Sequence, residues 1–169
     1  KRSKVVCGSF RSNPGVVEEG QGGSLEVEVL PQGTMPEAIR AGGAGLGGFN
    51  TPTAAGTLLA KGRQTKVLDG KEHVFQAPLK ADVALLRAWK ADTAGNLVYL
   101  RTENNFNQAA ATAGKIVIAE AEEIVPVGEL NPNEIHTPGC FVDYLVQAHT
   151  TLEELGISAS VEGLALKTH

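Results

Sequence analysis

PQGTMPEAIRAGGAGLGGFNTPTAAGT, residues 31–57, is the stretch from which the fold is best approached. It follows a strand-like run, LEVEVL, and it contains a short segment at residues 35–41 with Pro36 near its start and two glycines after its end. Proline in the first turn and glycine past the last residue are typical of the two ends of a helix. The later glycines allow tight turns or close approach of the backbone to a ligand. The stretch therefore predicts either one wall of a ligand site or a flexible connection.

Strand-like and helix-like segments alternate along the rest of the chain. The run DVALLRAW, residues 82–89, predicts a strand buried on both faces of a parallel sheet. Asp69-Gly70 predicts a β-hairpin, and the asparagines that open the alanine-rich segment at 104–114 predict a capped helix. Further strands are expected at residues 4–7, 25–30, 97–100 and 115–121. This order predicts one α/β domain over residues 1–169, with an open, mainly parallel sheet, flanking helices and one hairpin insertion.

Three segments carry weaker signals. Residues 16–19 predict a single helical turn, and CFVDYLVQA, residues 140–148, fits either a strand or a helix. TTLEELGI predicts a helical turn at the start of a C-terminal tail, residues 150–169. There is no internal repeat.

Composition excludes several classes of function. The chain has 169 residues, a net charge of −4 and a pI of about 5.6, and this acidity argues against nucleic-acid binding. No apolar run is long enough to span a membrane and no signal peptide is recognisable, so we expect a cytoplasmic protein. Cys7 and Cys140 predict free thiols in a reducing compartment, and no spacing suggests a metal site. Because the numbering starts at Lys1 and a strand follows almost at once, we expect the chain to begin inside a larger protein.

No complete catalytic set is recognisable from the residues alone. GxSxG, P-loop and HExxH motifs are absent from the sequence. Adjacent carboxylates at 18–19, 122–123 and 153–154 are typical of solvated faces, and His73 fits a surface position in a strand. His136, in a loop fixed by prolines and a glycine, is expected to be structural.

Four motifs, in order along the chain, resemble the A (alpha) subunit of the family I 3-oxoacid coenzyme A-transferases. They are PQGT–AIRAGGAGLGGFNTPT, LRAWKADTAGNLVY, NNFN–ATAGK and GELNPNEIHTPG, within a match from about residue 4 to residue 146. The family includes succinyl-CoA:3-ketoacid, acetoacetate/butyrate and 3-oxoadipate transferases, and the LGGF variant looks most like the short-chain acetate/acetoacetate enzymes. The resemblance implies the coenzyme A-transferase fold.

The resemblance also implies a reaction and a partner. These enzymes move coenzyme A between an acyl-CoA and a free carboxylic acid by a ping-pong route through a glutamyl-CoA thioester. The glutamate belongs to a B subunit, in a Ser-Glu-Asn-Gly motif that this chain lacks; Glu103-Asn104-Asn105 mimics it only superficially. The chain is thus expected to be one component of a hetero-oligomeric enzyme, with no catalytic glutamate, metal or resident cofactor of its own and with coenzyme A as a substrate.

Substrate-binding residues follow from the same resemblance. Gln32 would face the active site and donate a hydrogen bond to the acyl carboxylate or developing oxyanion, and the glycine-rich loop would form the other wall. The structural alternative for Gln32 is an amide that caps the turn before the helix. The implied substrate-binding set is Gln32, Gly33, Gly42, Gly43, Ala44, Gly45, Phe49, Thr51, Pro52 and Thr53.

Three departures from the family pattern bear on activity. The family's N-terminal βαβ unit is expected before Lys1, and a sheet without those strands would need a partner to cover it. The family usually has glycine at the position of Ala54 and arginine at the position of Asn104. The missing N-terminal segment and Asn104 favour an alternative function, a non-catalytic ligand-binding or regulatory domain on the same fold, whereas the intact PQGT and GGAG segments favour the transferase.

Overall fold

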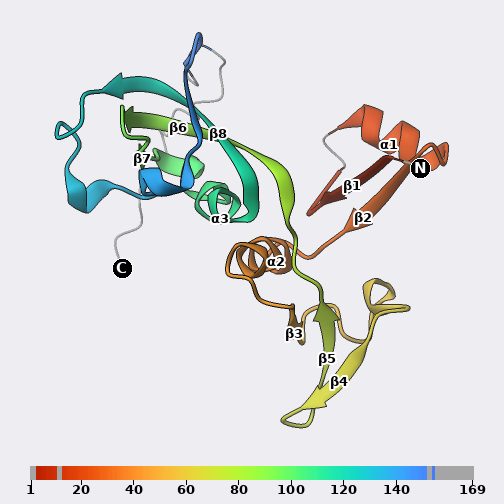
Figure 1. Ribbon diagram of the computed structural model, residues 1–169. Coiled ribbons are helices and arrows are strands. Elements are labelled where there is room, and N and C mark those ends of the chain that lie inside the picture. Colours follow the sequence, from red (N-terminus) through yellow and green to blue (C-terminus); the bar gives the residue numbers. More distant parts are fainter. Residues whose placement is uncertain (1–2, 11–12, 152–153, 155–169) are drawn as a thin grey trace, which may run out of the picture. The chain divides into compact units, whose positions relative to one another are not determined.

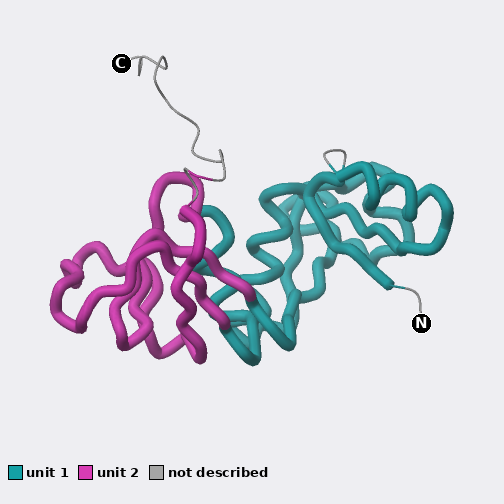
Figure 2. Tube along the Cα trace, turned by 90° about the horizontal axis from the view of Figure 1, so that it is seen from above, with its two compact units in different colours: residues 1–84, 105–117 teal, residues 85–104, 118–169 magenta. Residues whose placement is uncertain are grey.

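The computed structural model describes residues 3–10, 13–151 and 154. Figure 2 shows the chain as two compact units, residues 1–84 with 105–117, and residues 85–104 with 118–169. Two of the three boundaries between the units fall within strands, β6 (Ala81–Asp92) and β8 (Gly114–Val125). A single domain over residues 1–169 therefore stays a prediction, and each unit is described by itself.

Unit 1 begins with a βαβ arrangement (Figure 1). Strand β1 (Ser3–Cys7) pairs in parallel with β2 (Leu25–Val29), and α1 (Pro14–Gln21) connects them. The side chain of Asn13 caps α1 by accepting a hydrogen bond from the Val16 amide over 3.2 Å. The helix has eight residues, so it is longer than the single turn expected at 16–19. Both strands are confirmed.

Two short helices pack closely in the same unit. Helix α2 (Thr34–Gly43) confirms the segment expected at 35–41, although Gly42 and Gly43 lie in its last turn rather than beyond its end. Helix α3 (Asn107–Ala113) confirms the alanine-rich helix. The expected asparagine cap is wrong, because Phe106 occupies the N-cap position and makes no side-chain cap bond there.

A three-stranded antiparallel sheet completes unit 1, in the order β3-β5-β4. Its strands are β3 (Phe49–Thr51), β4 (Thr65–Leu68) and β5 (Lys71–Gln76). The hairpin between β4 and β5 turns at Asp69 and Gly70, whose φ angles of 49° and 73° are those of a two-residue hairpin loop. The predicted hairpin insertion is therefore confirmed.

A four-stranded sheet has the order β7-β6-β8-β9. Strand β7 (Leu97–Val98) is antiparallel to β6, whereas β9 (Tyr144–Gln147) is parallel to β8. The segment that fitted either a strand or a helix thus supplies a 3-10 turn, Gly139–Phe141, and then a strand.

Burial along β6 corrects one expectation. Ala84, Leu86 and Ala88 are buried, but the side chain of Leu85 is 76% exposed and that of Val83 is 47% exposed. In its first half the strand therefore has one buried face and one open face, and the prediction of burial on both faces is wrong there. A continuous apolar run does not reveal an open face, because apolar side chains are common on protein surfaces.

The fold is α/β, as the sequence predicts, with its strands divided among three sheets and both parallel and antiparallel ladders. The sequence predicted one open sheet, so the division into three sheets differs from the prediction. The helical turn expected at 150–157 and the tail at 150–169 lie mostly outside the described residues. Within the described part of the chain, no helix combines the length and apolar character that crossing a membrane requires.

Candidate functional site

The candidate site lies in unit 1, where β2 ends and α2 begins. The turn is held by hydrogen bonds from the amides of Thr34 and Met35 to the carbonyl of Pro31, over 2.9 and 3.1 Å. Gln32 and Gly33 are exposed in this turn, whereas Thr34 is only 6% exposed. In α/β proteins, ligands commonly bind beyond the carboxyl ends of parallel strands, and Gln32 occupies such a position after β2.

Three segments that are distant in sequence meet around a cavity beside this turn. Its volume of about 10 Å³ suits a single water molecule rather than a substrate. The β2–α2 segment contributes Val29, Pro31 and Thr34, the segment after β3 contributes Thr51, Thr53, Ala54 and Leu59, and the hairpin region contributes Arg63, Val74 and Gln76. Two of the predicted substrate-binding residues, Thr51 and Thr53, therefore lie near the PQGT turn.

A larger, open groove shares two residues with this cavity. It has a volume of about 260 Å³ and is lined by Glu28, Arg63, Gln64, Phe75, Gln76 and Ala77. This volume is slightly below that of typical small-molecule sites, so the groove suits a small ligand.

Arg63 lies at the junction of the cavity and the groove. Its Nη1 donates to Oε1 of Gln76 over 2.6 Å, and its Nη2 donates to Oε1 of Glu28 over 2.8 Å. The second oxygen of Glu28 is paired with Nζ of Lys4 over 2.7 Å. These contacts tie β2 to β5 and place one carboxylate and one guanidinium in the lining of the groove.

Sequence reasoning missed Arg63 and Gln76. Neither residue belongs to a motif, since one follows a connecting turn and the other ends a hairpin strand. Their pairing depends on how the hairpin packs, and no local signal in the sequence identifies it.

The other predicted site residues are spread over unit 1. Gly42 and Gly43 are in α2, where a Cβ on Gly42 would lie 1.9 Å from the carbonyl oxygen of Leu79 and one on Gly43 would lie 2.1 Å from Oγ1 of Thr112. These two glycines therefore serve close packing. The remaining members are Ala44, Gly45 and Pro52, which are all exposed, and Phe49, which is half-buried in β3 opposite Gln76.

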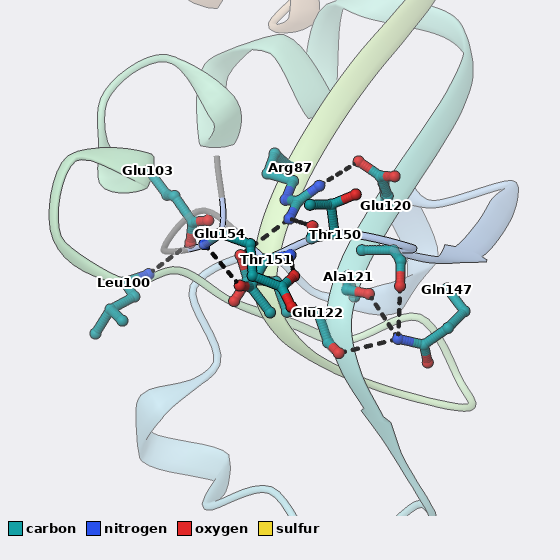
Figure 3. Close-up of polar contacts among 11 residues, drawn as sticks. Arg87, Leu100, Glu103, Glu120, Ala121, Glu122, Gln147, Thr150, Thr151 and Glu154 are labelled. Atoms are coloured by element: carbon teal, nitrogen blue, oxygen red, sulfur yellow. Dashed lines mark hydrogen bonds and ion pairs between the residues drawn. The ribbon is translucent and has the colours of Figure 1, made fainter. Parts of the chain in front are cut away.

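A second polar cluster lies in unit 2 around Arg87 (Figure 3). The guanidinium pairs with Glu120 over 2.5 Å and with Glu122 over 2.9 Å, and it donates to the carbonyl of Thr150 over 2.6 Å. Glu123 pairs with Lys90 over 2.6 Å. The adjacent carboxylates at 122–123 are thus engaged in ion pairs along the sheet, which indicates a structural role.

Glu103 is a buried carboxyl group of unit 2, with 7% of its surface exposed. Its Oε2 accepts a hydrogen bond from the Leu100 amide over 2.8 Å. Burial raises the pKa of Glu103, and the bond from Leu100 partly offsets this rise. Glu103 is not among the residues that line the groove.

The remaining candidates have structural contacts. His136 accepts a hydrogen bond at Nδ1 from the Tyr99 amide over 3.1 Å, and its ring stacks on that of Tyr99. Nδ2 of Asn104, at the position of the family's arginine, donates to the carbonyl of Tyr99 over 3.3 Å. Cys7 and Cys140 are both free thiols. The described residues contain no His/Cys/Asp/Glu group arranged to hold a metal ion.

Comparison with known proteins finds similarity to coenzyme A transferases. A family model described as Coenzyme A transferase matches residues 2–148. The chain is 56% identical over 124 residues to the A subunit of a probable succinyl-CoA:3-ketoacid coenzyme A transferase of Bacillus subtilis, covering 73% of this chain and 52% of that protein. It is 46% identical over 143 residues to the alpha subunit of an acetate CoA-transferase of Escherichia coli, covering 85% of this chain and 65% of that one. The chain thus spans between half and two thirds of the length of these relatives.

Solved structures agree on the fold. The chain superposes on an acyl-CoA transferase from Escherichia coli O157:H7, in a thioester complex with CoA, with a TM-score of 0.77 and 22% identity, covering 85% of this chain and 32% of that one. At this identity the likeness shows the fold alone. Taken with the family match over residues 2–148, it leads to one conclusion: this chain belongs to the coenzyme A transferase family.

Proposed function

We propose that this chain is part of the A subunit of a coenzyme A-transferase. The enzyme would move coenzyme A between a short-chain acyl-CoA or 3-oxoacyl-CoA and a free carboxylic acid. The observation that carries the proposal is the high identity over most of the chain to the two relatives above, 56% and 46%. The proposal includes a cytoplasmic, hetero-oligomeric enzyme.

The described residues would bind and orient the substrate rather than attack it. A glutamate of the B subunit would attack the thioester carbonyl, and a glutamyl-CoA thioester would carry the coenzyme between the two half-reactions. Gln32 is exposed after β2, so its amide is accessible to donate a hydrogen bond to the oxyanion that develops during attack. One preorganised donor of this kind is typically worth about 3 kcal/mol of transition-state stabilisation.

The groove at Arg63 supports a place for the free acid. Arg63 offers a planar guanidinium, which is suited to carboxylate groups, in an open groove of about 260 Å³. In the structure Glu28 forms an ion pair with this guanidinium, and Glu28 also forms an ion pair with Lys4. An acid substrate would share the guanidinium with Glu28 or displace it, because ion pairs that are partly exposed contribute little.

The alternative, a non-catalytic ligand-binding domain on the same fold, predicts binding without turnover. The comparisons favour the transferase, since both relatives above carry transferase names. Asn104 supports the alternative only if transfer requires the arginine that the family usually has at this position. The amide of Asn104 makes a hydrogen bond there.

The test is an assay of the complete protein with its B subunit, using acetoacetate and succinyl-CoA. We expect acetoacetyl-CoA to form, and Gln32→Ala to lower kcat by about 100-fold. Gln21→Ala, an exposed amide at the end of α1, is the matched control and should retain full activity. If no acyl-CoA and acid pair supports transfer although both subunits assemble, the transferase proposal fails and the binding domain is favoured.

A further inference from the structure

Gly8 and Gln32 both lie just beyond the same end of the parallel strand pair β1 and β2. Cys7 and Val29 are register partners at the ends of β1 and β2, and the Leu30 amide donates to the carbonyl of Cys7 over 3.0 Å. Gly8 is the next residue after β1, and Gln32 follows Leu30 by two positions. The two segments therefore emerge beside each other at the edge of the sheet where the candidate site lies.

The amide group of Gln32 fills the space that a side chain at position 8 would need. A Cβ built on Gly8 would lie 2.3 Å from Oε1 of Gln32 and 3.4 Å from its Cδ. A separation of 2.3 Å is well inside van der Waals contact, so this position of the amide is compatible only with glycine at residue 8. The argument holds whichever way the amide is flipped, since both orientations place an atom there.

The backbone itself does not require glycine at this position. Gly8 has no φ in the left-handed region, unlike Gly45 and Gly56, whose φ angles are 71° and 72°. Among the described residues, the only close contact for an added methyl group is therefore the far end of a flexible side chain. Alanine would leave the strand intact and would force Gln32 to rotate.

We propose that Gly8 is a positioning residue, which holds the Gln32 amide over the end of β1 and so fixes the direction in which its N–H groups donate. This inference rests on the proposed function of Gln32. Displacement of a catalytic group by about 1 Å can lower a rate by 10²-fold, so a methyl group at position 8 has a large effect on turnover and a small one on folding.

Gly42 and Gly15 show why this effect is specific. At Gly42 the atom in the way is a backbone carbonyl oxygen, so alanine there disturbs the packing of α2. At Gly15, in the first turn of α1, the nearest atom to an added Cβ is 3.5 Å away, which is an ordinary contact. Gly15→Ala is therefore the matched control for a glycine-to-alanine change in the same βαβ arrangement.

A double-mutant cycle in the assembled enzyme tests the proposal. Gly8→Ala is expected to lower kcat by about 10- to 100-fold with the melting temperature little changed, whereas Gly15→Ala retains kcat. In the Gln32→Ala background, Gly8→Ala is expected to change kcat by less than about twofold, because the group that it displaces is already absent. Gly8→Ala with wild-type kcat, or with an equal loss in both backgrounds, overturns the proposal.

A crystal structure of the Gly8→Ala enzyme provides a readout that does not depend on activity. The Gln32 amide is expected to move by more than about 1 Å while β1 and β2 superpose, and an amide that stays in place overturns the proposal. Transfer that is active but insensitive to Gln32→Ala overturns both the role of Gln32 and that of Gly8. An assembly without transfer overturns the proposed function separately, and the position of the amide then decides whether Gly8 positions Gln32.

Discussion

Arg63 donates a hydrogen bond from Nη1 to Oε1 of Gln76 over 2.6 Å, and this contact joins the segment after the 3-10 turn Leu58–Ala60 to the last residue of β5. Gln76 is 5% exposed, so its amide oxygen depends on this donor. The same guanidinium holds Glu28 of β2. The pair is therefore part of the framework that brings the three segments of the candidate site together.

Arg63→Met should lower the free energy of unfolding by about 1–3 kcal/mol, because a buried acceptor loses its partner. Urea denaturation measures this change. Arg40→Met is the control: Arg40 pairs with Glu37 on the exposed face of α2, where both side chains are more than half exposed. Its loss should stay within about 0.5 kcal/mol, and an equal loss in the two variants would contradict a structural role for the Arg63–Gln76 contact.

Ala54→Gly should stabilise the protein. Ala54 has a φ of 71°, a conformation that costs a non-glycine residue about 1–2 kcal/mol. Part of the gain is offset by the greater freedom of glycine in the unfolded chain, so the expected net increase is about 0.5–1 kcal/mol. Gly56→Ala tests the same physics in reverse, since Gly56 has a φ of 72° and open space around it. Thermal unfolding should move the two melting temperatures in opposite directions.

Gly42→Ala should destabilise the protein, although alanine normally favours a helix. The added Cβ would lie 1.9 Å from the carbonyl oxygen of Leu79, so the end of α2 has to shift, at a cost of about 1–3 kcal/mol. Gly15→Ala in α1 meets no such contact and should be neutral or stabilising by up to about 1 kcal/mol. Chemical denaturation of the two variants distinguishes packing from helix propensity, and a stabilised Gly42→Ala would show that α2 does not pack as described.

Glu103→Gln should change how stability depends on pH. Burial raises the pKa of Glu103 above its ordinary 4.5, so the folded protein binds this proton more tightly than the unfolded chain does. The contribution of Glu103 to the free energy of unfolding of the wild type is therefore fully present below pH 4.5. It is lost as the pH rises through the raised pKa. Because glutamine does not titrate, the stability of the variant minus that of the wild type should increase over this range and then level off.

Asp82→Asn should change the pH dependence of stability in the opposite direction. The hydrogen bond and charge of Lys115 lower the pKa of Asp82 below its ordinary 3.8. That contribution is present above pH 3.8 and is lost as the pH falls through the lowered pKa, so the variant-minus-wild-type difference should decrease as the pH rises. Unfolding measured in urea between about pH 3 and 8 provides both curves, and a flat curve for Glu103→Gln would show that its carboxyl is solvated.

Local patterns in the sequence predicted most of the individual elements. The alternation in LEVEVL, the Asp69-Gly70 turn and the alanine-rich segment all form the expected strand, hairpin and helix. Each of these signals depends on residues within a few positions of one another, through side-chain periodicity or turn conformation. The PQGT turn likewise follows from the proline and glycine positions around α2.

Contacts between residues that are distant in the sequence could not be predicted from local patterns. The open face of β6 at Leu85, the role of Gly42 in packing, and the pairing of Arg63 with Gln76 depend on which elements pack together, and no local pattern encodes this. The same holds for Gly8, whose significance appears only when β1 and β2 are side by side.

By itself the sequence determined the α/β class, the family resemblance and the position of Gln32 in a turn after a strand, because short-range patterns and ordered motifs carry this information. Only the tertiary structure decided which side chains surround that turn. Burial, steric exclusion and hydrogen bonding at the site act between residues such as Gly8 and Gln32, or Glu28 and Arg63, and these become neighbours only when the strands pair and the hairpin packs.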